Sequence, residues 1–185
     1  RPDVHTAALV DLANVAIQRG EYEEGEGLLR EAQARSDPAK KPGMAARISN
    51  NLGNILAYRG DLEAALAAYS EALRLKTEEG DPVGCRIAVG NMGLMCLRLG
   101  RSEEALQHFA ASLRAARVLG HRRGEAWSLI AIALLGMRGG ALSFEFLVVH
   151  LLLCERKGAH IFVQRLLVAL ICPKIPAQEA SLQGQ

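Results

Sequence analysis

Aromatic residues are scarce in this 185-residue chain, at 4% of the composition, and neither sign of charge is in clear excess. The 22 basic and 20 acidic side chains give a formal net charge of +2 and are spread along the chain. Proteins that bind nucleic acid usually carry a concentrated basic patch, and those that bind single strands also offer aromatic stacking platforms. The composition therefore argues against binding to nucleic acid.

Cysteine and targeting signals are also sparse. The cysteines form no CxxC pair and no regular framework, so reduced thiols in a cytoplasmic protein are the simplest interpretation. No apolar leader follows a basic start, and the chain opens with Arg1 and Pro2 instead of an initiator methionine. We therefore expect a cytoplasmic segment of a longer protein. The cysteines are Cys85, Cys96, Cys154 and Cys172.

Motifs that carry enzymatic chemistry are missing as well. No phosphate loop of the GxxxxGK type occurs, and GCRIAVGNMG at residues 84–93 lacks the spacing and the strand of a dinucleotide loop. The acidic residues of EYEEGE, residues 21–26, fall at an expected helix start, where the dipole favours them as a solvated face over a catalytic pair. The arginines of GHRRGE, residues 120–125, could contact phosphate, although arginines at such a turn are ordinary surface residues. The sequence thus predicts no enzymatic activity and no cofactor.

A metal site is not predicted either. His150 and Cys154 lie four residues apart and would share one face of a helix, with His160 further along the chain. Zinc sites need three or four ligands at a productive spacing, and the additional ligands are missing here. A polar residue with a satisfied hydrogen bond on an apolar helix is the preferred interpretation.

Helix-forming residues dominate the first 140 positions, and glycine divides them at a twenty-residue interval with one gap. Apolar positions recur every three or four residues between the glycines, which suits helices, and glycine tolerates the positive φ found just past a helix end. Helices joined by very short turns must pack antiparallel, so the sequence predicts an all-α fold. The glycines are Gly20, Gly60, Gly80, Gly100, Gly120 and Gly140. The predicted helices span residues 2–19, 21–35, 43–59, 61–79, 82–99, 101–119 and about 122–138.

A second pattern repeats every forty residues. Residues 58–73 read YRGDLEAALAAYSEAL, and residues 98–113 read RLGRSEEALQHFAASL. In the first copy Gly53 allows one helix to approach its partner closely, Ala65 offers the matching small surface, and Tyr69 fills the wider gap toward the next pair. Glycine, alanine and an aromatic return at Gly93, Ala105 and Phe109. Because such a pair cannot bury its faces alone, we expect successive pairs to stack.

The segments NNLGNILAYRGDLEAALAAYSEAL and GNMGLMCLRLGRSEEALQHFAASL, with the linker EEGDPVGCRIAVGN, resemble the forty-residue form of the tetratricopeptide repeat. The resemblance implies a right-handed α-solenoid of antiparallel helix pairs over residues 1–140. Its units would span about 2–40, 43–80, 82–120 and 122–140. The family's usual role implies a noncatalytic scaffold that binds a partner protein, here as part of a larger regulatory protein.

The resemblance also implies which residues would contact a partner, because the first helix of each pair lines the concave face. Asparagine can hold an extended peptide backbone and arginine can pair with carboxylates, so we expect a protein or peptide partner with an acidic segment. Two alternatives remain open: the asparagines bond between neighbouring repeats, and the arginines are simply solvated. The implied contact positions are Asn14, Arg47, Asn50, Asn51, Asn54, Asn91, Leu94, Arg98 and Arg138.

The composition changes after residue 140. Two apolar stretches, ALSFEFLVVHLLLC and AHIFVQRLLVALIC, are each shorter than a membrane-spanning helix and are separated by charged residues. We expect residues 141–172 to form an atypical apolar helix pair, followed by a polar tail at 173–185. The pair would cap the array, form an interface for self-association or contact a membrane, and a spliced or out-of-frame C-terminus would give the same break. The alternative function is therefore structural oligomerisation or membrane anchoring through this segment.

Overall fold

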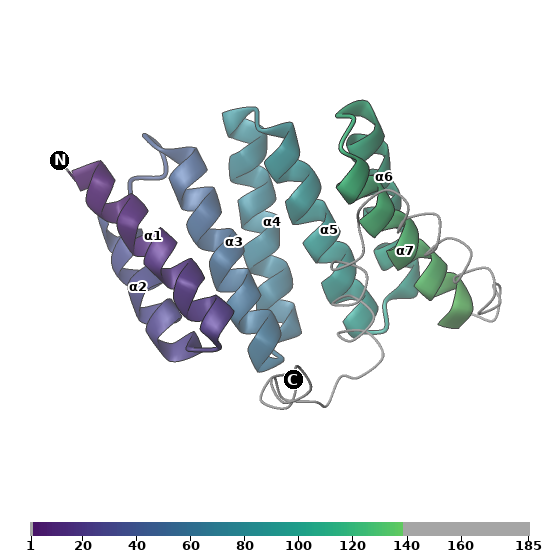
Figure 1. Cartoon of the computed structure of the whole chain (residues 1–185), viewed down its shortest axis with the longest axis horizontal. Helices are drawn as coiled ribbons and strands as arrows, with labels where there is room; N and C mark the ends of the chain where they lie inside the picture. Colours follow the sequence, from purple (N-terminus) through teal and green to yellow (C-terminus); the bar gives the residue numbers. More distant parts are fainter. Residues whose placement is uncertain (1, 139–185) are drawn as a thin grey trace, which may run out of the picture.

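The computed structural model describes residues 2–138, which form seven α-helices and no strand (Figure 1). Side-chain placement is described for residues 4–136. The helices are α1 (Pro2–Arg19), α2 (Tyr22–Arg35), α3 (Pro42–Arg59), α4 (Leu62–Glu79), α5 (Pro82–Arg98), α6 (Ser102–Val118) and α7 (Arg122–Arg138). Their ends fall within two residues of the predicted ones.

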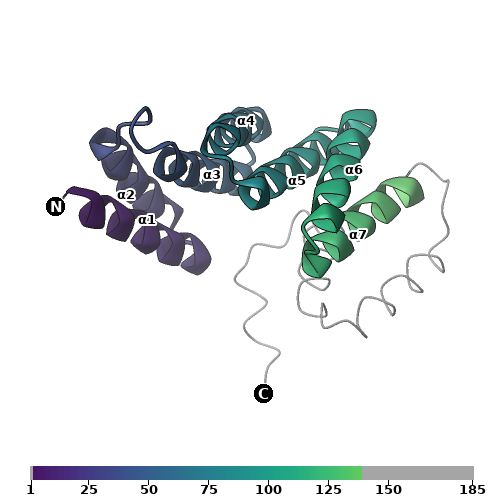
Figure 2. The same ribbon diagram turned by 90° about the horizontal axis from the view of Figure 1, so that it is seen from above.

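Consecutive helices pack side by side along an arc, with α1, α3, α5 and α7 on its inner side (Figure 2). The helices α1, α3 and α5 each pack against the even-numbered helix that follows, and α7 packs against α6. The prediction of an all-α array of antiparallel helix pairs is therefore confirmed for the described residues.

The turns between helices depend on glycine. Gly60 has φ of 87° and Gly100 has φ of 78°, which a residue with a side chain adopts only with strain. The amide of Gly60 donates to the carbonyl of Ala57, so the residue closes α3 while the chain reverses. Asp61 then begins α4 by accepting a hydrogen bond from the amide of Ala64 at 3.3 Å. One glycine and one cap therefore suffice to reverse the chain between α3 and α4.

In the second and third pairs, a glycine of the first helix faces an aromatic ring of the second helix. A Cβ atom added at Gly53 would lie 2.7 Å from Cε1 of Tyr69, and one added at Gly93 would lie 2.8 Å from Cε1 of Phe109. The sequence interpretation matched these glycines with alanines, but the nearest atoms are those of the rings. Because the aromatic side chain is long, it reaches back across its own pair as well as toward the next one.

The same rings connect neighbouring pairs. Tyr69 shares a buried cluster with Met95 of α5, and Phe109 meets Trp127 of α7 edge to face, with ring centroids 5.3 Å apart. The predicted contact of the aromatic residue with the next pair is thus present in both repeats. Residues 139–185 lie outside the described residues, together with the predicted apolar pair, the polar tail and the cluster of His150, Cys154 and His160.

Candidate functional site

A hollow of about 300 Å³ opens between α1, α3 and α5, with α4 behind it. Four of the implied contact residues line this hollow, one from α1 and three from α3: Asn14, Arg47, Asn50 and Asn51. Residues at the start of α5 complete the wall, notably Val83 and Ile87. The inner sides of three successive helix pairs therefore form one surface, which we call the inner groove.

Arg47 is already engaged inside the chain. Its Nη2 atom lies 2.6 Å from Oδ1 of Asp11, on the neighbouring α1. The side chain of Asp11 is 68% exposed and that of Arg47 is 41% exposed, so solvent screens the pair and a partner can compete for it. The arginine is therefore neither simply solvated nor reserved for a partner.

Three asparagines form a polar row across α3 and α5. Asn91 donates from Nδ2 to Oδ1 of Asn50 at 3.2 Å, and Asn50 donates to Oδ1 of Asn51 at 3.5 Å, a long contact. The bonding between neighbouring repeats that sequence reasoning left open is therefore present, although Asn50 provides the link. A carboxamide has two donor hydrogens and two acceptor lone pairs, so these bonds use only part of its capacity.

Three of the remaining implied residues make contacts within the array itself. Asn54 accepts a hydrogen bond from the hydroxyl of Tyr69 at 2.8 Å, and Leu94 packs against two hydrophobic clusters. Arg98 is exposed and donates to the carbonyl of Ala57 at 2.7 Å, in the last turn of α3. The side chain of Arg138 lies outside the described residues. Asn54, Leu94 and Arg98 thus contribute to the packing of the array on which the groove is built.

Apolar residues of the groove were missed by the sequence reasoning. Val83 and Ile87 are 41% and 42% exposed, although both are large and hydrophobic. They precede Asn91 at intervals of four residues, so all three lie on one face of α5. That spacing shows from the sequence which face they share with Asn91, but not that this face is exposed.

An ion-pair network lies at the far end of the groove. Lys76 bonds to Oε2 of Glu79 at 2.8 Å and to Oδ2 of Asp81 at 3.0 Å. The amide of Gly84 and then Lys76 lower the pKa of the Asp81 carboxyl. Burial opposes the charge of Lys76, but its carboxylate partners outweigh burial and raise the pKa of the ammonium group. One ammonium group thus faces two carboxylates at this end of the groove.

Residues 2–138 contain neither a membrane-spanning helix nor a cluster of metal ligands. No helix there combines the length and the apolar character that crossing a bilayer requires. In the same range, no three His, Cys, Asp or Glu side chains gather where they could hold a metal ion. The thiols of Cys85 and Cys96 are free, and burial raises the pKa of Cys96.

Comparison with known proteins gives both a family and a fold. One tetratricopeptide repeat family model matches residues 5–78, and a second one matches residues 88–111. The crystal structure of BtubC (BKLC) from P. vanneervenii superposes with a TM-score of 0.69 at 17% identity, covering 95% of this chain and 68% of that one, which is a likeness of fold. No curated protein matches the chain. The forty-residue pattern, the stacked helix pairs and the family matches agree, and the chain belongs to the tetratricopeptide repeat family.

Proposed function

We propose that this chain is a noncatalytic scaffold that binds a peptide or helical segment of a partner protein in the inner groove, as one part of a larger regulatory protein. Tetratricopeptide repeats generally mediate protein–protein interactions, and the family is generally noncatalytic. The single observation that carries the proposal is the hollow between α1, α3 and α5, where exposed apolar and polar side chains meet.

The composition of the hollow indicates how a segment would bind. Val83 and Ile87 offer apolar surface that an apolar side chain of the partner would cover, at roughly 25 cal/mol per Å² of buried apolar area. The unused hydrogen-bonding capacity of Asn50 and Asn91 lies on the same inner side and would pair with the backbone of that segment. One apolar anchor beside a polar row suits a peptide better than a small charged ligand.

The groove is prepared for binding before the partner arrives. Asn50 is held by Asn91 and Asn51, so its side chain loses little conformational freedom in a complex. Ordering a long side chain costs roughly 0.5–1.5 kcal/mol on association, so contacts that already fix it favour affinity.

An acidic residue of the partner would bind at Arg47. The pair with Asp11 is exposed, and such pairs contribute about 0–1 kcal/mol, so a carboxylate that brings further contacts can replace Asp11. The variant Asp11→Asn therefore tests whether the bound segment of the partner is acidic. This variant frees Arg47 and would tighten binding of an acidic partner.

The experiment compares two variants that place the same charge on different sides of the array. Ile87→Glu puts a carboxylate into the groove, and Leu106→Glu puts one on α6, where Leu106 is 47% exposed. Each variant is used as bait in a lysate, and the captured proteins are identified by mass spectrometry after equal helicity is confirmed.

The proposal requires a partner protein that is captured by the wild type and by Leu106→Glu but not by Ile87→Glu. Equal capture by all three chains would place the binding surface elsewhere. A partner lost only in Leu106→Glu would assign binding to the outer side.

A further inference from the structure

Arg86, near the start of α5, is a buried arginine that forms no ion pair with the carboxylates of residues 2–138. The residue is 8% exposed, and its Nε atom has no hydrogen-bond partner among the described residues. Burial alone lowers the pKa of the guanidinium, because no described carboxylate lies near enough to raise it. Arginine stays protonated in proteins, so the fold holds an uncompensated positive charge here.

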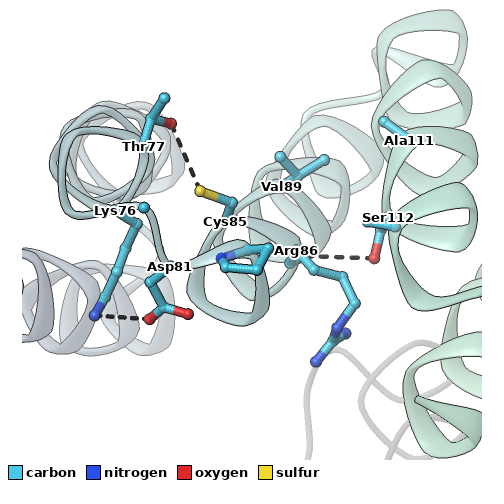
Figure 3. Close-up of a pocket in the computed structure, with 11 residues that line it drawn as sticks. Lys76, Thr77, Asp81, Cys85, Arg86, Val89, Ala111 and Ser112 are labelled. Atoms are coloured by element: carbon cyan, nitrogen blue, oxygen red, sulfur yellow. Dashed lines mark hydrogen bonds and ion pairs between the residues drawn. The ribbon is translucent and has the colours of Figure 1, made fainter. Parts of the chain in front are cut away.

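The guanidinium lies against the first turn of α7. A Cβ atom added at Gly124 would lie 2.7 Å from Nη1 of Arg86 and 2.8 Å from Nδ1 of His121. Figure 3 shows the side chain of Arg86 running away from Val89 and Ala111, so that the guanidinium is turned away from these residues of the hollow. The carbonyl of Arg86 accepts a hydrogen bond from Ser112 at 3.4 Å, so α6 holds this part of α5 in place.

The surroundings of the guanidinium are positive. The N-terminus of a helix carries a partial positive charge, and exposed Arg122 and Arg123 lie in the same first turn of α7. The carboxylate of this turn, Glu125, is bonded to Arg117 at 3.0 Å. The amide of Gly124 donates to Nδ1 of His121, so the residue that caps α7 brings no negative charge.

The junction before α5, forty residues earlier, provides a comparison for the charges at the junction before α7. Forty residues before His121, the helix cap is Asp81, whose carboxylate accepts from the amide of Gly84 at 2.9 Å. Forty residues before Arg86 stands Ala46, which is fully buried and uncharged. At the junction before α5 the carboxylate of Asp81 thus pairs with a cation, Lys76, whereas at the junction before α7 the buried cation Arg86 has no free carboxylate beside it among the described residues.

We propose that Arg86 and the first turn of α7 form a binding site for an oxyanion, a carboxylate or a phosphate group. The planar guanidinium offers a pair of parallel N–H donors to two oxygens, and the helix terminus stabilises the same charge. Arg86 also belongs to the lining of a hollow of about 490 Å³ between α4, α5 and α6. The site uses none of the implied groove residues and stands independently of the proposed function.

The test measures thermal unfolding of the full chain by circular dichroism at neutral pH. Potassium phosphate, potassium malonate and potassium chloride are compared at equal ionic strength, so that only specific binding differs. Phosphate binding without malonate binding would identify a phosphate site, and the reverse would identify a carboxylate site. At saturating anion the melting temperature of the wild type should rise by about 2 °C or more over chloride.

Two substitutions and one control separate binding from folding. Arg86→Met removes the charge and keeps the length, so it should raise the melting temperature in chloride and abolish the anion-dependent rise. Gly124→Ala keeps the charge but displaces the guanidinium, and it should also abolish the rise. Arg114→Met, at an exposed arginine of α6, should keep the wild-type response.

The proposal requires an anion-dependent rise in the wild type and in Arg114→Met, and its loss in Arg86→Met and Gly124→Ala. No rise in the wild type, or an equal rise in Arg86→Met, would overturn it. A lower melting temperature or a failure to fold for Arg86→Met in chloride would also overturn it, because Arg86 would then have a structural role.

Discussion

The second and third repeats share a backbone but differ in chemistry. Glycine, alanine and an aromatic residue recur at equivalent positions, and in both copies the ring packs on the glycine of its own pair. The positions that differ lie on the inner side and at the junctions, where Arg47 becomes Ile87 and Asp81 becomes His121. The recurring positions therefore specify the array, and the variable positions are the ones to which we assign binding in our proposals.

The largest expected effect tests the shared packing. Phe109→Ala removes a fully buried ring that contacts α5 and Trp127, and should lower the free energy of unfolding by about 3–5 kcal/mol. Leu106→Ala, an exposed position on the same helix, should cost less than about 1 kcal/mol. Urea unfolding measures both, and similar losses would contradict the assignment of the core.

A smaller effect tests the contact between glycine and ring. Gly93→Ala places a methyl group 2.8 Å from the ring of Phe109 and should cost about 1–3 kcal/mol in the free energy of unfolding. Gly27→Ala, in the middle of α2 with nothing within 4 Å, should stabilise the chain by about 0.5–1 kcal/mol. A shift of the urea midpoint in the same direction for both variants would show that close packing is not the reason for Gly93.

The third prediction concerns the acidic cap of α5, which the junction before α7 lacks. The pKa of Asp81 is lowered in the folded chain by the amide of Gly84 and by Lys76, so its stabilising effect is present above the ordinary carboxyl pKa near 4. That effect is lost as the pH falls through the lowered value. Asp81→Asn should therefore cost about 1 kcal/mol in the free energy of unfolding at neutral pH, a modest value for a side chain one-third exposed.

The pH dependence provides the check on that prediction. The difference in stability between the wild type and Asp81→Asn should shrink as the pH falls below about 4, where the carboxyl of the unfolded chain becomes protonated, and disappear below the lowered pKa of the folded chain. If the difference in the free energy of unfolding stays constant from neutral pH to pH 3, the loss comes from the changed shape of the side chain and not from its charge.

The last prediction concerns the difference between the rings of Tyr69 and Phe109. Tyr69→Phe makes the second repeat match the third, removing one hydrogen bond to Asn54 at an expected cost of about 0.5–1.5 kcal/mol. Asn54→Leu together with Tyr69→Phe copies the third repeat fully, since Leu94 is the equivalent of Asn54. The double variant should recover part of the loss in urea unfolding, and additive losses would show that the two residues are not coupled.

Much of the fold could be predicted because its rules are local. Glycine at a positive φ and apolar residues at helical spacing are visible within twenty residues, and the turn at Gly60 follows directly from them. The partner of an asparagine is not local. Asn91 bonds to Asn50 forty-one residues away, and the sequence offered Asn51 as an equal choice.

Two features could be found only in three dimensions. Arg86 looks like any arginine at the start of a helix, and its burial against Gly124 depends on how α7 packs on α5. Val83 and Ile87 look like core residues, because most valines and isoleucines are buried, and only the hollow beside them shows their exposure. In both cases the packing of neighbouring repeats decides the role of the residue.

The most direct test of the groove is site-specific photo-crosslinking in a lysate. A photoreactive phenylalanine analogue is placed at Ile87, inside the groove, or at Leu106, on α6, because the two side chains are similarly exposed. If the groove is the binding surface, a partner protein should crosslink to position 87 and not to position 106. Crosslinks from position 106 alone, or equally from both, would contradict the account.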